Sequence, residues 1–264
     1  MIDGRRIIDA PEASLYGQPS VQFRPNDFDA AIWSHGYDVV CEQAVRCPCC
    51  GSSDAALPDC ENCHGFGYFF INPVRTKALI TGLNRSTNYV QWNPELMGTA
   101  AITVRDEDKR LVSFLNRVTV EDEIATFTES RLVTETVDGN VMCFLSYAPV
   151  TIERVYKFYG SDQKLYRLDD SCYEIMENNS YCLRFTKGNV EPETAISIVY
   201  THRVEYHIID MPHEIRASLG RDKMSGQFQI LKMPVQSIGR RTHLLVGKPN
   251  YGGGGLLIND DIER

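Results

Sequence analysis

The 264-residue chain has little positive charge, no long apolar run and few recognisable motifs. Lys and Arg together number 27 against 35 Asp and Glu, which gives a formal net charge of −8. This balance excludes general binding to duplex DNA, because such binding depends on basic groups that displace counterions from phosphates. No window approaches about eighteen consecutive apolar residues, so we expect no transmembrane helix and no membrane partner.

The common catalytic motifs are also absent. The sequence has no Gly-x-Ser-x-Gly elbow, no Walker loop and no His-Glu-x-x-His motif. His202 and His207 fall in a long β-like run, and we interpret them as residues of a sheet. His213, Glu214 and Arg216 offer an acid–base set, but we interpret them as the polar start of a helix. The sequence therefore predicts a protein that is not an enzyme.

Both ends of the chain have the composition of extended segments. The first residues lack the apolar core of a secretory signal, so we expect folding in a reducing cytoplasm. Residues 1–36 are predicted to form an arm with one short helix, Asp27–Ser34, capped by Asn26. Gly252–Gly255 predict a flexible tail. The alternative is an arm that becomes ordered only against a neighbouring subunit.

From residue 74 onward the pattern is almost entirely β. Strand-like runs such as Thr99–Arg105 and Thr151–Tyr159 recur at intervals of about 8 to 12 residues, which is typical of a sandwich or barrel. Asp138-Gly139-Asn140 between two such runs predicts a hairpin. After Pro212 we expect a helix, His213–Leu219, that ends at Gly220 and is followed by a strand, Phe228–Ile238.

The predicted fold is therefore mainly β, with two barrel or sandwich modules that either share one core or have separate cores, and with a small cysteine-rich insertion. The predicted divisions are an N-terminal arm (1–36), a zinc knuckle (37–72), a first β module (73–148), a second β module (149–212) and a C-terminal helix, strand and tail (213–264).

Five of the nine cysteines are concentrated between Cys47 and Cys63. Cys47 and Cys50 form one Cys-x-x-Cys pair, and Cys60 and Cys63 form a second. Two such pairs can enclose one ion in the tetrahedral sulfur shell that Zn²⁺ prefers, and a shell closed by four protein ligands is structural. The sequence thus predicts structural Zn²⁺ as the cofactor.

Three alternatives stay open at the cysteine cluster. Cys49 can replace Cys50 as a ligand, His64 can replace one sulfur, or the thiols can be free or redox-active. The other four cysteines lie in apolar or strand-like surroundings and are predicted to be small buried side chains: Cys41, Cys143, Cys172 and Cys182.

The segments His35–Cys49, Cys60–Tyr68 and Val204–Arg216, the last preceded by Val199-Tyr200, resemble neck or head–tail connector proteins of tailed bacteriophages. The resembling segments amount to about a quarter of the chain. In that family the first half-site often reads Cys-Pro-Cys, which corresponds here to Cys47 and Cys49. Pro212–Arg216 is a distinctive part of the resemblance, with no assigned chemistry.

The resemblance implies a structural virion protein, assembled in the host cytoplasm, that forms a ring of roughly twelve or six copies. Its implied partners are a portal or adaptor protein, tail proteins, and DNA that passes through the lumen without sequence-specific binding. The alternative is a cytoplasmic zinc-ribbon module that holds nucleic acid or unfolded protein. Four aromatic residues after Cys63 could then stack bases: Phe66, Tyr68, Phe69 and Phe70.

Overall fold

The computed structural model of the chain describes residues 25–50, 60, 62–63, 66–82, 98–135, 139–159, 164–177, 179–211, 217–221 and 228–245. Residues 1–24 of the predicted arm and the predicted Gly252–Gly255 tail lie outside these ranges. None of the helices in the described ranges combines the length and apolar character that a membrane span requires.

The described elements are mostly strands. Helix α2 (Pro25–His35) includes the predicted helix and starts one residue before Asn26, at a proline suited to a first helical turn. The strands are β1 (Tyr37–Arg46), β2 (Tyr68–Gly82), β3 (Thr99–Val104), β4 (Arg117–Leu132), β5 (Thr134–Glu135), β6 (Val141–Phe144), β7 (Pro149–Tyr159), β8 (Lys164–Arg167), β9 (Tyr173–Met176), β10 (Asn179–Phe185), β11 (Ala195–Asp210), β12 (Ala217–Arg221), β13 (Phe228–Lys232) and β14 (Val235–Arg241). The 3-10 helices are η2 (Pro48–Cys50), η4 (Asp106–Val112), η5 (Asp170–Cys172) and η6 (Thr242–Leu244).

Six strands close into an antiparallel barrel. Their order is β14-β3-β2-β1-β4-β11, and the barrel closes because β14 pairs with both β3 and β11. Closure leaves no open strand edge where these pairings hold. The core is made of small and β-branched side chains, which suit a narrow barrel: Val39, Cys41, Ala78, Ile102, Val104, Val112, Val118, Val120 and Ile208.

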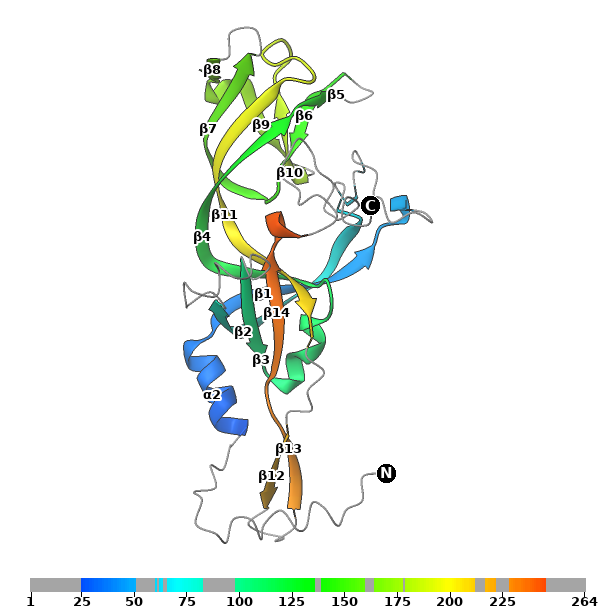
Figure 1. Cartoon of the computed structure of the whole chain (residues 1–264), viewed down its shortest axis with the longest axis vertical. Helices are drawn as coiled ribbons and strands as arrows, with labels where there is room; N and C mark the ends of the chain where they lie inside the picture. The colour runs from blue at the N-terminus through cyan, green and yellow to red at the C-terminus, as the bar shows by residue number, and fades with distance from the viewer. Residues whose placement is uncertain are drawn as a thin grey trace, which may run out of the picture.

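The long strands β4 and β11 continue beyond the barrel into a β-sandwich. There they pair with each other, and β7 and β8 extend the sheet to the order β4-β11-β7-β8. A second sheet, β5-β6-β10-β9, supplies the other layer, and buried residues of both sheets form one core that includes Leu183, Phe185, Ile196 and Ile198. Figure 1 shows β4 and β11 running through both units.

A bulge in β4 marks the change from barrel to sandwich. The register between β11 and β4 passes from Arg203↔Ile124 to Glu205↔Thr119, so residues 120–123 of β4 lie opposite the single residue Val204. Extra residues in one strand bend it. On the barrel side of the bulge, β4 pairs with β1 as far as Val120. Along β11, the pairing partner changes near the bulge from β7 to β14. One pair of strands thereby serves two cores.

The module boundary predicted at residues 148 and 149 does not match this arrangement. Strands from both sides of it share the eight-stranded sheet, and β4 and β11 each contribute to both cores. The predicted knuckle segment 37–72 also supplies β1 and the start of β2 to the barrel. The barrel and the sandwich are therefore divided across the long strands and not between consecutive parts of the sequence.

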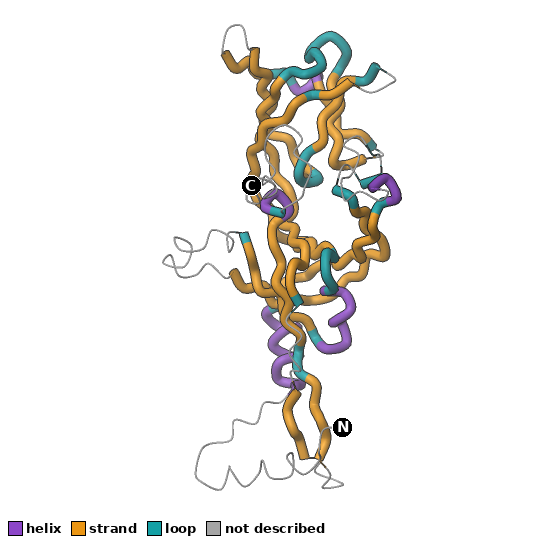
Figure 2. Tube along the Cα trace, turned by 45° about the vertical axis from the view of Figure 1, so that its right-hand side comes forward, coloured by secondary structure: helices purple, strands orange, loops and turns teal. Residues whose placement is uncertain are grey.

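The helix predicted over His213–Leu219 is wrong in its second half, where β12 begins at Ala217. β12 pairs with β13 in a hairpin that projects away from the barrel (Figures 1 and 2). Pairing with β13 overrides the helical pattern, which is a weak local preference. The predicted strand Phe228–Ile238 is divided into β13 and β14 around Pro234, because proline cannot donate to a strand ladder.

The predicted hairpin at Asp138-Gly139-Asn140 is confirmed by its flanking strands. β5 and β6 pair antiparallel, with Thr134 opposite Met142 and Glu135 opposite Val141. Gly139 has a φ of +74°, which glycine adopts without steric cost.

Candidate metal centre

Four cysteine side chains meet at the end of the β1–β2 pair. Cys47 follows β1 directly, Cys49 lies in η2, and Cys60 and Cys63 precede β2. β1 and β2 pair from Tyr37↔Ala78 to Arg46↔Tyr68, so the ladder holds both ends of the intervening segment. The barrel therefore fixes the two half-sites close together.

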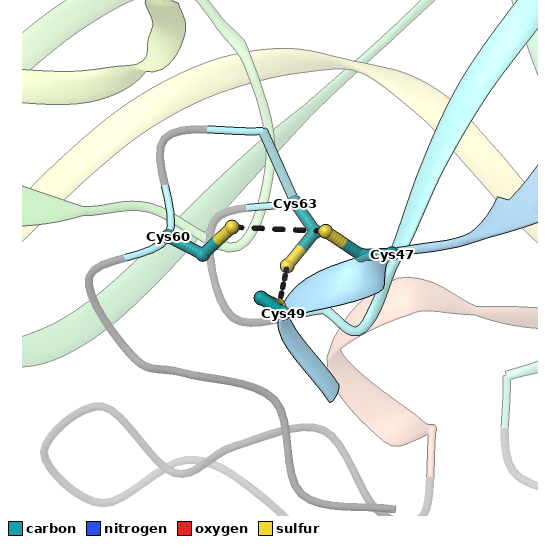
Figure 3. Close-up of side chains that lie close together, drawn as sticks. All are labelled: Cys47, Cys49, Cys60 and Cys63. Carbon is teal, nitrogen blue, oxygen red and sulfur yellow. Dashed lines mark hydrogen bonds between the residues drawn. The ribbon is translucent and has the colours of Figure 1, made fainter. Parts of the chain in front are cut away.

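The sulfur atoms have the spacing of a tetrahedral site. Cys47 Sγ lies 3.7 Å from Cys60 Sγ, and Cys49 Sγ lies 3.4 Å from Cys63 Sγ (Figure 3). All four lie within 4.8 Å of one another. A zinc–sulfur bond of about 2.3 Å places the sulfurs of a tetrahedron about 3.8 Å apart. The four cysteines could therefore coordinate one metal ion.

The structure brings Cys49, and not Cys50, to the fourth position. The Cys-x-x-Cys spacing favoured Cys50, with Cys49 as the alternative. The 3-10 turn of η2 directs the Cys50 thiol toward the carbonyl oxygen of Gly67, at 3.6 Å, and outside the four-sulfur group. The first half-site is therefore Cys-Pro-Cys, and His64 lies outside the described residues.

Backbone hydrogen bonds shape the site from the β2 side. The Cys47 amide donates to the Gly67 carbonyl over 2.7 Å, and the Phe66 amide donates to the Cys63 carbonyl over 2.8 Å. Gly67 has a φ of +75°, a left-handed conformation that a side chain would strain. This turn directs Cys63 toward Cys47 and returns the chain to β2.

Two of the four cysteines are shielded from water. Cys47 and Cys63 are buried, and Cys49 and Cys60 are half-buried. Burial raises the pKa of Cys47 and that of Cys63, because a thiolate loses its hydration in such surroundings. A divalent cation compensates this cost, since metal binding requires deprotonated cysteines and releases their protons.

A half-buried ionic network lies beside the four cysteines and was not apparent from the sequence. Arg117 on β4 pairs with Glu42 on β1 at 2.7 Å, and its guanidinium lies 4.3 Å from the centre of the Phe70 ring. The same guanidinium contacts the hydroxyl of Tyr181 on β10, which also donates to Glu205 on β11. The network thus joins barrel strands to the sandwich. Its members are far apart in sequence, so no local pattern links them.

The aromatic residues after Cys63 contact the protein body. The Phe66 and Phe70 rings lie 6.1 and 5.3 Å from the ring of His207, which bonds to Thr242 at 3.1 Å. A cavity of about 290 Å³ is lined by Cys63, by these rings and by Arg117 and Tyr181, among others. All four of the aromatic residues considered for base stacking are half-buried, and all four line this cavity.

Three of the four cysteines outside the cluster are buried, as predicted, and Cys172 is not. Cys41 belongs to the barrel core, Cys143 to the sandwich core, and Cys182 is buried beside Met142, while Cys172 is only half-buried. The predicted sheet residues His202 and His207 are buried on β11. The possible acid–base set at residues 213–216 lies outside the described residues.

A scan of protein-family models and a search of curated proteins gave no match to the chain.

Proposed function

We propose that Cys47, Cys49, Cys60 and Cys63 bind one Zn²⁺ ion that fastens the segment between β1 and β2 to the barrel. The four sulfur atoms within 4.8 Å of one another are the observation that carries this proposal. Four thiolates would satisfy the tetrahedral preference of zinc and leave no position for water, so the role is structural and not catalytic. A tetrathiolate site also fits iron, and metal analysis separates the two.

We further propose that the chain is a structural subunit of the ring-shaped neck that joins a phage head to its tail. The resemblance of the segments around Cys47–Cys63 and Val204–Arg216 to neck proteins supports this role. The barrel and sandwich units agree with it, and the projecting β12–β13 hairpin offers an arm that neighbouring subunits can contact. The acidic balance suits a ring that DNA passes without being held.

Native mass spectrometry and elemental analysis of the full chain test the two parts separately. We expect one zinc per chain and a single closed oligomer of about six or twelve copies. A purified protein without metal, whose thiols all react freely, would overturn the zinc centre. A chain that stays monomeric at all concentrations and binds single-stranded nucleic acid at physiological salt would support the zinc-ribbon alternative instead.

A further inference from the structure

The sandwich has one exposed sheet face with an apolar row across it. Leu132 on β4, Ala195 on β11, Phe158 on β7 and Leu165 on β8 are successive cross-strand partners. Directly paired residues project to the same side of an antiparallel sheet. The neighbouring residue Ile196 is buried in the core, so this row lies on the opposite, outer face. Leu132, Phe158 and Leu165 are 47%, 39% and 59% exposed.

The same outer face is basic next to the apolar row. Tyr156 lies opposite Arg167, and Arg154, two residues from Tyr156 on β7, lies opposite Val199. No carboxylate is a cross-strand partner in the rows that contain these residues, and the exposed Glu153 precedes Arg154 at an irregularity of β7. In the described part of the chain, neither arginine has an ion-pair partner. Arginine, tyrosine and exposed apolar side chains together are typical of the centre of a protein interface.

The complementary charge lies at the opposite edge of this sheet. The β4 bulge contains Glu121, Asp122 and Glu123, and Asp122 and Glu123 are exposed. Glu121 pairs with Arg75 at 3.0 Å, whereas Asp122 and Glu123 have no ion pair in the part of the chain that the structure describes. In the sandwich part of the eight-stranded sheet β8 is one edge and β4 is the other, because the pairing of β4 with β1 ends at Val120, before the bulge residues 121–123.

We propose that the outer face around Arg154, Arg167 and the apolar row binds the β4 bulge of a second copy of this chain. Two different complementary surfaces on one chain generate a head-to-tail contact, which closes into a ring when the rotation between copies allows it. This inference names the subunit contact of the proposed ring and rests on that part of the proposed function. The contact joins Asp122 and Glu123 to Arg154 and Arg167, and covers Phe158 and Leu165.

A surface with two arginines and an aromatic ring can also bind a polyanion such as nucleic acid. The acidic balance of the whole chain weakens that choice, because the field of the protein repels phosphate. The leucines of the apolar row also match a protein surface better than a phosphate backbone. The observations therefore favour a second copy.

Charge reversal of each surface tests the contact in the full-length, metal-loaded chain. We expect Arg154→Glu with Arg167→Glu, and separately Asp122→Arg with Glu123→Arg, to raise the dissociation constant for self-association at least about 100-fold, because like charges then face each other. The chain that carries all four substitutions restores complementarity and should reassemble. Lys187→Glu, at an exposed position in the loop after β10, is the matched control and should leave assembly unchanged. Analytical ultracentrifugation over a concentration series gives the constants.

The outcomes separate this contact from the ring itself. If both double variants still form the ring of the wild-type protein, the proposed contact is wrong and the proposed ring is unaffected. A wild-type chain that is monomeric overturns both. Dissociation in the double variants without recovery in the fourfold variant also contradicts the contact, provided that circular dichroism shows all variants folded. If Arg154→Glu with Arg167→Glu instead abolishes binding of a fluorescent single-stranded oligonucleotide and leaves the mass unchanged, the face binds nucleic acid.

Discussion

Cys49 and Cys50 are adjacent in sequence, but their sulfurs have different roles. Cys49 Sγ lies 3.4 Å from Cys63 Sγ inside the four-sulfur group, whereas the Cys50 thiol donates to the Gly67 carbonyl. The 3-10 turn over Pro48–Cys50 directs the two side chains differently. The pair therefore offers a candidate ligand and, one residue away, a matched cysteine outside the four-sulfur group.

Substitution of these two cysteines should separate metal binding from packing. We expect Cys49→Ser to lower the zinc content well below one ion per chain, because only three sulfurs remain in the shell. Cys50→Ser should keep one zinc per chain and lose only the stability that its packing contributes. Elemental analysis after dialysis gives both values. Metal loss in the Cys50 variant with full retention in the Cys49 variant would reverse the ligand assignment.

Removal of the metal should loosen the segment between β1 and β2 and leave the barrel folded. The barrel core does not include the four cysteines, and the β1–β2 ladder continues away from them to Tyr37↔Ala78. We therefore expect a chelator to lower the melting temperature by several degrees with little change in far-ultraviolet circular dichroism. Amide exchange should quicken first at Cys47 and Phe66, whose hydrogen bonds shape the site. Complete unfolding on chelation would contradict this picture and make the ion a condition for folding.

The buried ion pair between Glu129 and Arg131 should contribute far more to the free energy of unfolding than an exposed ion pair does. Glu129 accepts hydrogen bonds from the Ser146 amide at 2.8 Å and the Tyr200 hydroxyl at 2.6 Å, and Arg131 is only 4% exposed. Arg131→Met leaves the Glu129 carboxylate without its cation and should cost about 3–5 kcal/mol of unfolding free energy. Arg184→Met, which breaks the exposed pair with Glu174, should cost about 0–1 kcal/mol. Urea unfolding measures both, and equal losses would contradict the prediction.

His202 should make the fold less stable in mild acid. Burial lowers the pKa of His202 from 6.5 to about 4, while its ring stacks on Tyr147 with centroids 3.7 Å apart. The unfolded chain therefore binds a proton at a higher pH than the folded chain. The associated stability is present above about pH 6.5 and is lost as the pH falls toward 4, by about 1–2 kcal/mol at pH 5.

The His202→Gln variant isolates this contribution from that of other titrating groups. Arg241 and Glu129 also act on the ring, and they stay in place in the variant. Urea unfolding of both proteins between pH 7 and 5 should show a steeper loss in the wild type. Equal slopes would mean that His202 keeps an ordinary pKa in the folded state.

The strands were predictable from the sequence because alternation of apolar and polar residues is a local property. Their partners were not. The continuation of β4 through residues 121–123 was not predictable, because three acidic residues there interrupt the apolar pattern. The boundary between the barrel and the sandwich was also not predictable from local patterns. It depends on which strand lies beside β4 and β11 at each point.

The candidate metal site was predictable in composition but not in its fourth ligand. The two Cys-x-x-Cys pairs have the sequence spacing of a four-cysteine metal site. That spacing does not predict how the turn at Pro48 orients the side chains of Cys49 and Cys50. The network around Arg117 was missed because Glu42, Tyr181 and Glu205 come from three separate strands. Long-range contacts of this kind follow from topology, which a single sequence does not display.

The two strands common to barrel and sandwich also determine how the molecule can come apart. Since β4 and β11 supply side chains to both cores, melting either unit removes one wall of the other. Heating should therefore produce a single cooperative calorimetric transition, with van't Hoff and calorimetric enthalpies in agreement. Fragments cut between β6 and β7 should not fold alone, because each would keep only one of the two shared strands.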